Sequence, residues 1–188
     1  MKLGFTAFRA VIGATLFAHG AQKLFGWFGG YGLDATGQAF DSMGLKPGKR
    51  MAALAGASEA GGGALLATGL LTPLGSTAII GVMSQAIESV HKEKGFFVTE
   101  GGYEYNLAII AAALAIADHG PGPISLDRAL GIEKKGTLVA LAALAAGIAG
   151  PQLVKRLSAG GEEPAPATPS DDGGAAAPAE QETVASAT

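Results

Sequence analysis

Polar and ionisable side chains stand inside the longest apolar segments of this sequence, where they could hold a proton or a ligand. In the first segment, His19 and Lys23 are four residues apart and Gln22 lies beside them. Residues four apart share one face of a helix, and Arg9 falls on the same stripe at about 100° per residue. Glu59 lies deep in the second segment. Because a charge facing hydrocarbon is costly, we expect these five side chains to form a polar cluster between helices.

The role of this cluster has two interpretations. A buried carboxylate at position 59 could relay protons or contact a ligand, which is the usual role of a carboxylate inside a membrane. Alternatively, Glu59 forms a structural ion pair with His19, Lys23 or Arg9, which would offset its desolvation. Lys23 could also serve as an anchor that reaches the lipid headgroups.

A second set of polar residues could supply ligands to a metal ion or to the same cluster. Glu88 and His91 have the Glu-x-x-His spacing that di-iron bundles use twice, but this sequence has it once. Glu104 and Asn106 open the fourth apolar segment and point to different sides. We therefore predict no metal site, and the end of an amphipathic helix is the expected role of Glu88 and His91. No phosphate loop, nucleophile elbow or zinc motif is present, so no catalytic residue is assigned.

Composition indicates a membrane protein. The chain has 188 residues, of which 48% are hydrophobic and 15% are charged, whereas soluble domains have about 25% charged residues. No cysteine is present, so the chain has no thiol chemistry of its own. The net charge of −3 and the lack of a dense basic face exclude a nucleic-acid-binding protein.

Four apolar segments predict an all-α, polytopic transmembrane four-helix bundle. They cover about residues 5–25, 51–71, 74–90 and 103–117, and about 20 residues cross a hydrocarbon core of about 30 Å. Thr72 and Pro73 break the second segment from the third, which predicts a tight antiparallel hairpin. Arg9 inside the first segment argues against a cleaved signal peptide. The positive-inside rule leaves the orientation open.

The remaining parts of the chain are expected to be smaller. We predict a short helix over residues 36–43, capped by Thr36, and a short helix capped and stabilised by Asp127 and Arg128. Residues 131–157 hold a fifth apolar, alanine-rich segment, which is either a further span or a surface helix. Residues 158–188 are acidic, rich in Pro and Ala, and predicted to be disordered. The predicted membrane domain therefore covers residues 1–130.

Four stretches, taken together in this order, resemble the DoxX family of bacterial membrane proteins over about residues 5–130. They are LFAHGAQKLFGWFGG from Leu16, GASEAGGGALLATGLLTPLGS from Gly56, GGYEYNLAII from Gly101 and HGPGPISLD from His119. The resemblance implies a multi-pass, four-helix protein of the bacterial inner (plasma) membrane. The matching positions are His19, Gly20, Lys23, Glu59, Glu104 and the Gly-Pro-Gly at 120–122, and no catalytic role comes with them.

The family takes its name from a subunit associated with quinone-coupled thiosulfate oxidation, and some members are linked to oxidative or thiol stress. The resemblance therefore implies an accessory component of a membrane redox or stress system, with the bilayer and soluble redox proteins as candidate partners. A second copy of the chain is a further candidate partner, because four or five spans are few for a transporter. No resident cofactor is predicted, although a quinone could bind near His19 and Glu59 and use both for proton transfer. A small-solute transporter and a scaffold without chemistry are the alternatives, and the sequence does not decide whether the protein is an enzyme.

Overall fold

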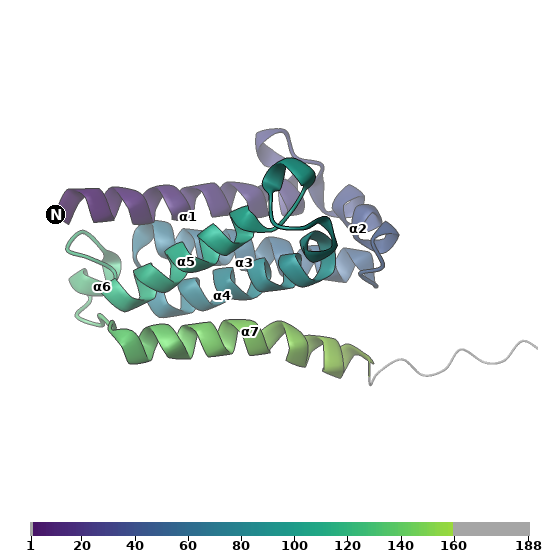
Figure 1. Cartoon of the computed structure of the whole chain (residues 1–188). Helices are drawn as coiled ribbons and strands as arrows, with labels where there is room; N and C mark the ends of the chain where they lie inside the picture. Colours follow the sequence, from purple (N-terminus) through teal and green to yellow (C-terminus); the bar gives the residue numbers. More distant parts are fainter. Residues whose placement is uncertain (1, 160–188) are drawn as a thin grey trace, which may run out of the picture.

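The computed structural model describes residues 2–159, and this part of the chain is entirely helical (Figure 1). The predicted disordered tail lies, from residue 160 onward, outside the residues that the structure describes. The five long helices are α1 (Lys2–Phe25), α3 (Gly48–Thr68), α4 (Thr72–Ala86), α5 (Glu104–His119) and α7 (Thr137–Ala159). The short ones are η1 (Trp27–Gly29), α2 (Gly32–Ser42), η2 (Ile87–His91), η3 (Lys92–Lys94), η4 (Val98–Glu100) and α6 (Leu126–Ala129).

The long helices run roughly side by side, with α7 along one flank and α2 at one end (Figure 1). Helix α1 packs mainly on α3, whereas α4 packs on α3, α5 and α7. The predicted hairpin is present, since only Gly69, Leu70 and Leu71 separate α3 from α4. Helix α2 begins one turn before the expected start, because the Thr36 hydroxyl donates to the carbonyl of Gly32 (2.7 Å) from inside the helix and does not cap it.

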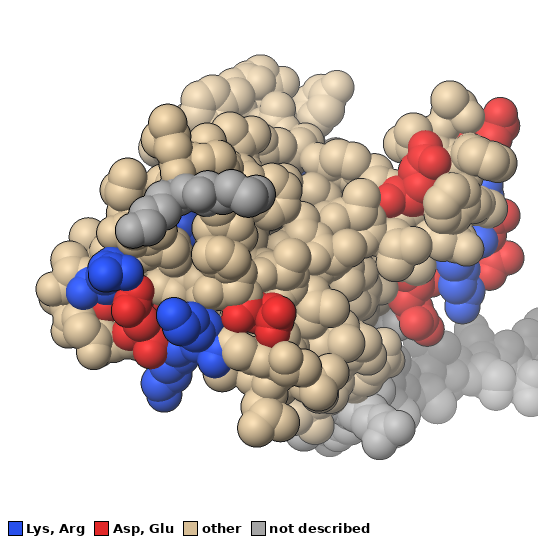
Figure 2. Space-filling view, turned by 60° about the vertical axis from the view of Figure 1, so that its left-hand side comes forward, with Lys and Arg blue, Asp and Glu red and all other residues tan. Residues whose placement is uncertain are grey.

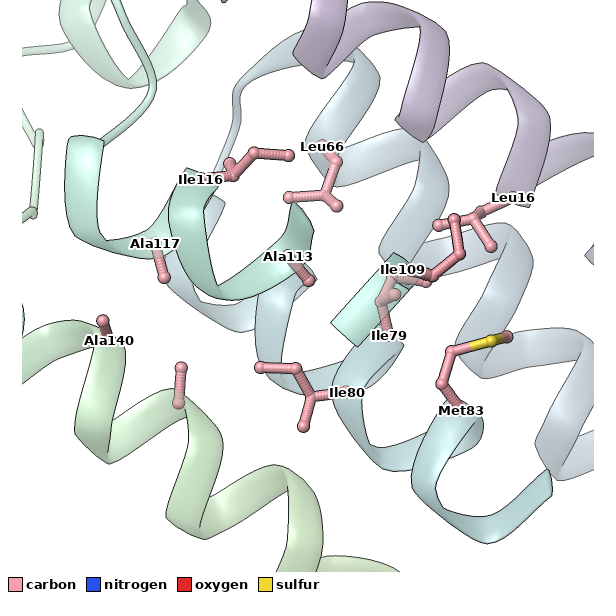
Figure 3. Packing of buried hydrophobic residues seen from close by; sticks show 11 residues of the cluster. Leu16, Leu66, Ile79, Ile80, Met83, Ile109, Ala113, Ile116, Ala117 and Ala140 are labelled. Carbon is pink, nitrogen blue, oxygen red and sulfur yellow. The ribbon is translucent and has the colours of Figure 1, made fainter. Parts of the chain in front are cut away.

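The apolar core is built from one face of each long helix. Figure 3 shows Leu16 of α1, Leu66 of α3 and Ile79 of α4 beside the buried face of α5, which carries Ile116 and other apolar residues. The Ile80 side chain of α4 extends toward α7 instead. Ala140 and Ala143 bring α7 onto the same core. Helix α7 is therefore packed into the bundle through its alanines, although its sequence alone allowed a detached surface helix.

Glycines let α1 and α3 approach closely. A Cβ atom added at Gly13 would overlap the backbone of Ala67, one at Gly20 would overlap the backbone of Ala60, and one at Gly63 would overlap that of Phe17. Small residues at such a contact allow dispersion contacts between the two backbones, which is the usual way for helices to associate in lipid. This contact fixes the position of α1 relative to α3.

Substitution of Gly63 by valine should push α1 and α3 apart and lower the free energy of unfolding by about 2–3 kcal/mol, the usual cost of overpacking. Gly61→Val is the matched control on the same helix, because a Cβ at Gly61 meets nothing within 4 Å. Unfolding of both purified variants in detergent micelles measures the difference. Equal stability of the two variants would contradict the close contact.

The end of the α3–α4 hairpin is held by two buried charges. The Arg9 guanidinium donates to the carbonyl of Leu66, to that of Ala67 (2.9 Å) and to that of Ile124 (2.7 Å). The Asp127 carboxylate accepts from the backbone N–H of Leu71 (2.7 Å) and Thr72 (3.0 Å), and from the Thr72 hydroxyl (2.8 Å). Arg9 thus satisfies carbonyls at the C-terminus of α3, and Asp127 caps the N-terminus of α4.

The expected capping of the short helix by Asp127 and Arg128 is therefore corrected. The side chain that caps α6 is that of Ser125, whose hydroxyl accepts from the backbone N–H of Arg128 (3.3 Å). Asp127 turns away from its own helix because the N-terminus of α4 offers it three donors.

Charged side chains gather at the two ends of the visible face, and a broad, mostly uncharged band lies between them (Figure 2). By length and hydropathy, α1 from Leu3 to Phe25 is the one helix among the described residues able to cross a membrane, and the apolar part of α7 (Thr137–Leu153) is shorter. The other predicted spans do not meet this test. Helix α3 carries Glu59 and several glycines, and the α-helical parts of α4 and α5 are only 15 and 16 residues long.

Candidate functional site

A cavity of about 360 Å³ lies between α1, α3, the α4–η2 segment and the start of α5. Apolar side chains make up most of its wall, among them Leu16, Val82 and Met83. The polar side chains that line it are His19, Lys23, Glu59, Gln85, Ser89, His91, Tyr105 and Asn106. Such a cavity, with a few convergent polar groups in an apolar wall, is the usual form of a small-molecule site.

An ion pair between two helices forms one side of this cavity. The Lys23 ammonium of α1 lies 2.5 Å from Oε2 of Glu59 on α3, and the side chains are 26% and 7% exposed. Gly56 makes this possible, because a Cβ there would press within 3.3 Å of the Cβ of Lys23 and closer to the Leu24 side chain. The lysine stem can therefore lie against α3 while its ammonium reaches the carboxylate. Glu59 consequently carries a paired charge inside the bundle.

Two imidazoles stand near the pair. His19 precedes Lys23 by one helical turn on α1 and also lines the cavity, although much of its surface is exposed. His91 lies at the end of η2, a single π-helical turn, and its Nδ1 is 2.7 Å from the carbonyl oxygen of Gly101. π-helical turns are rare and occur often at functional sites. His91 thereby links the wall of the cavity to the loop that precedes α5.

Glu88 and Glu104 do not line the polar cavity. Glu88 is exposed and does not line the cavity, so the Glu-x-x-His spacing does not bring it to the site of His91. The Glu104 carboxylate accepts from the backbone N–H of Val98 (2.9 Å), which holds the loop between η3 and α5 in place. Within residues 2–159, no group of three or more His, Asp or Glu side chains is arranged to hold a metal ion.

Asn106 is buried in the cavity wall, where its amide donates to the Met83 thioether (3.4 Å). Gln85 also lines the cavity, and its amide donates to the hydroxyl of Ser89. Sequence reasoning missed Gln85 and Ser89, although their spacing of four residues inside an apolar segment is the same signal that marked His19 and Lys23.

The structure separates Arg9 and Gln22 from the expected cluster. Arg9 lies about 21 Å along α1 from Lys23 at 1.5 Å per residue, and the carbonyls at the end of α3 hold it there. The Gln22 amide donates to the carbonyl of Phe28 (3.2 Å) and so stabilises the turn after α1. The group that the fold brings together is therefore His19, Lys23, Glu59, His91 and Asn106.

This arrangement can both donate and accept hydrogen bonds within an apolar enclosure. The ammonium of Lys23 donates, the carboxylate of Glu59 accepts, and an imidazole does either, according to its protonation state.

Comparison with known proteins bears on the first half of the chain. The DoxX family model matches residues 4–92, which span α1 to the end of η2 and include His19, Lys23, Glu59 and His91. The stretches GGYEYNLAII and HGPGPISLD, which also carry the resemblance, lie beyond the matched residues. No curated protein and no solved structure matches the chain. The match over residues 4–92, slightly less than half of the chain, supports membership of the DoxX family, a family of membrane proteins.

Proposed function

We propose that this chain is a multi-pass protein of the bacterial inner membrane, with α1, α3, α4–η2 and α5 as four spans and α7 as a fifth. At about 1.5 Å per residue, the 21 residues of α3 extend about 31 Å, close to the thickness of a hydrocarbon core. Large apolar side chains such as Val11, Leu74 and Leu138 are more than half exposed, as lipid-facing residues would be. Membrane family membership and the uncharged band of Figure 2 support the same arrangement.

Within that membrane, the proposed role is an accessory component of a redox or oxidative/thiol-stress system. The cavity would hold a quinone headgroup or a small sulfur compound. Soluble redox proteins would dock on the membrane surface and exchange electrons with this bound molecule. The chain has no cysteine, so its own contribution would be binding groups and proton carriers. A second copy of the chain is a further candidate partner.

The observation that carries this proposal is the Lys23–Glu59 pair on the wall of a cavity large enough for a small molecule. A pair whose only role was to fix helix packing would not need a cavity beside it. In the proposed site, Lys23 donates to a carbonyl oxygen of the ligand, and Glu59 and His19 can accept or return a proton.

Binding of 1,4-benzoquinone to the full chain in lipid nanodiscs tests the proposal. Glu59→Gln keeps the shape of the side chain but removes the charge that holds the Lys23 ammonium beside the cavity. We expect the dissociation constant to rise about tenfold or more, because Lys23 would no longer be held in place to donate its charge-assisted hydrogen bond to the quinone carbonyl. Asp34→Asn is the control, because Asp34 forms a largely exposed ion pair with Lys49 (2.6 Å) and neither residue lines the cavity. Equal affinity of the Glu59→Gln variant and the unaltered chain, or no binding by either, would rule out this ligand site.

A further inference from the structure

A second hollow, of about 300 Å³, lies between α3, α4 and α7. Its wall includes Leu54 of α3, Ala78 and Gly81 of α4, and Ala146 and Pro151 of α7. None of the residues that line it is charged, and the polar ones are Ser58, Thr77 and Gln85. This hollow is therefore an apolar groove, in contrast with the polar cavity.

The groove and the polar cavity share one wall. Phe40, Leu45, Ala55, Val82 and Gln85 line both. Near the hairpin, α3 and α4 are in close contact at Gly62 and Gly75, whereas at Ala55 and Val82 cavities lie on both sides. The small side chain of Ala55 is one of the few groups that separate them. The two hollows are thus neighbours with a shared wall, and one reaches the Lys23–Glu59 pair while the other reaches α7.

We infer that the polar cavity and the α7 groove form one binding site for a single amphiphile, with a compact polar head beside Lys23 and Glu59 and a hydrocarbon tail between α3, α4 and α7. This inference rests on the proposed function, because it specifies the ligand class of the same cavity. The α3 and α4 walls of the groove lie within the residues that match the DoxX family, whereas the wall formed by α7 lies beyond them.

The chemistry of the groove favours a hydrocarbon tail over a peptide segment. A peptide bond buried there would need hydrogen-bond partners, and an unpartnered amide in an apolar environment is costly. The groove offers it only three polar side chains, and two of them already donate a hydrogen bond elsewhere: Gln85 to Ser89, and Thr77 to the carbonyl of Pro73 (2.9 Å). A hydrocarbon chain needs no partner and gains from leaving water or filling an apolar void.

The test compares 1,4-benzoquinone with 2-decyl-1,4-benzoquinone, both with the full chain in nanodiscs of one lipid composition. Ala146→Leu places a larger side chain into the groove from α7. Ala145→Leu is the matched control, since Ala145 is exposed on the same helix and lines neither hollow. Because the bilayer dissolves the tailed probe equally in every sample, the comparison is made between variants, and the thermal unfolding of each variant verifies its fold.

For the unaltered chain and Ala145→Leu, we expect the tailed probe to bind at least about tenfold more tightly than the tailless one. The Ala146→Leu variant should bind the tailed probe no more tightly than the tailless one, and its affinity for the tailless probe should stay unchanged. A tailed probe with a terminal diazirine should label α7 between Ala146 and Pro151 on irradiation.

The outcomes separate the two proposals. The amphiphile site is overturned if Ala146→Leu and Ala145→Leu weaken the binding of the tailed probe equally, or if the tail does not change the affinity. In that case the proposed function still stands if binding of the tailless probe depends on Glu59. Conversely, tail binding that depends on Ala146 but not on Glu59 supports the groove and overturns the role of the ion pair. Absence of binding by both probes overturns both proposals.

Discussion

Replacement of Lys23 by alanine is expected to destabilise the protein by about 3–5 kcal/mol, the cost of leaving one partner of a buried ion pair without compensation. The remaining charge would be Glu59, whose side chain is only 7% exposed. Its carboxylate would then lie between α1 and α3 without the ammonium that is 2.5 Å away in the intact protein. Chemical unfolding in mixed micelles, followed by circular dichroism, measures the change.

Lys49→Ala provides the control for this prediction. Lys49 and Asp34 are 2.6 Å apart, almost the same separation, but the side chains are 67% and 79% exposed. Exposed pairs contribute less than about 1 kcal/mol, so this variant should unfold nearly as the unaltered chain does. Similar losses for Lys23→Ala and Lys49→Ala would show that the buried pair has no special energetic role.

A double variant distinguishes the stabilising effect of the ion pair itself from the cost of leaving the Glu59 carboxylate without a partner. Lys23→Met combined with Glu59→Leu removes both charges and retains most of the volume, and buried pairs replaced in this way often lose no stability. We expect the double variant to recover most of the loss seen for Lys23→Ala. If it also loses the binding of 1,4-benzoquinone, the pair is needed by the site and is dispensable for the fold.

Replacement of Asp127 by alanine is the second large effect, with an expected loss of about 3 kcal/mol or more. Asp127 is 1% exposed and accepts three hydrogen bonds from Leu71 and Thr72. Without the carboxylate, donors at the N-terminus of α4 would be buried and unsatisfied, at about 1–3 kcal/mol each. The neighbouring Arg9 guanidinium, also 1% exposed, would lose an opposite charge.

Asp118→Ala is the matched control for Asp127→Ala, because the side chain of Asp118 is exposed. A surface change of this kind alters stability by about 0.5 kcal/mol or less. The midpoint of thermal unfolding should therefore fall for Asp127→Ala and stay almost constant for Asp118→Ala. Equal midpoints would contradict the role of Asp127 at the start of α4.

The periodicity and composition of the sequence determine the helices. The long apolar segments predict α1, α3, α4 and α5 to within a few residues, and Thr72-Pro73 marks the hairpin, because local sterics and hydrophobic spacing act within one turn of the chain. The sequence also determines that Glu59 needs a partner, since an isolated carboxylate cannot stay charged away from water. The sequence places the start of α2 one turn too late, at Thr36. The Thr36 hydroxyl donates backward to the carbonyl of Gly32 and does not cap the helix.

Only the tertiary structure decides which residues meet. Arg9, His19 and Lys23 share one stripe of α1 and were equal candidates to pair with Glu59, and the close α1–α3 contact at Gly20 and Gly56 sets Lys23 opposite the carboxylate. Asp127 finds its donors more than fifty residues earlier in the chain. The polar cavity and the α7 groove exist only because α3, α4, α5 and α7 pack at these positions. Contacts between distant segments depend on packing geometry, which the spacing of residues along one helix does not encode.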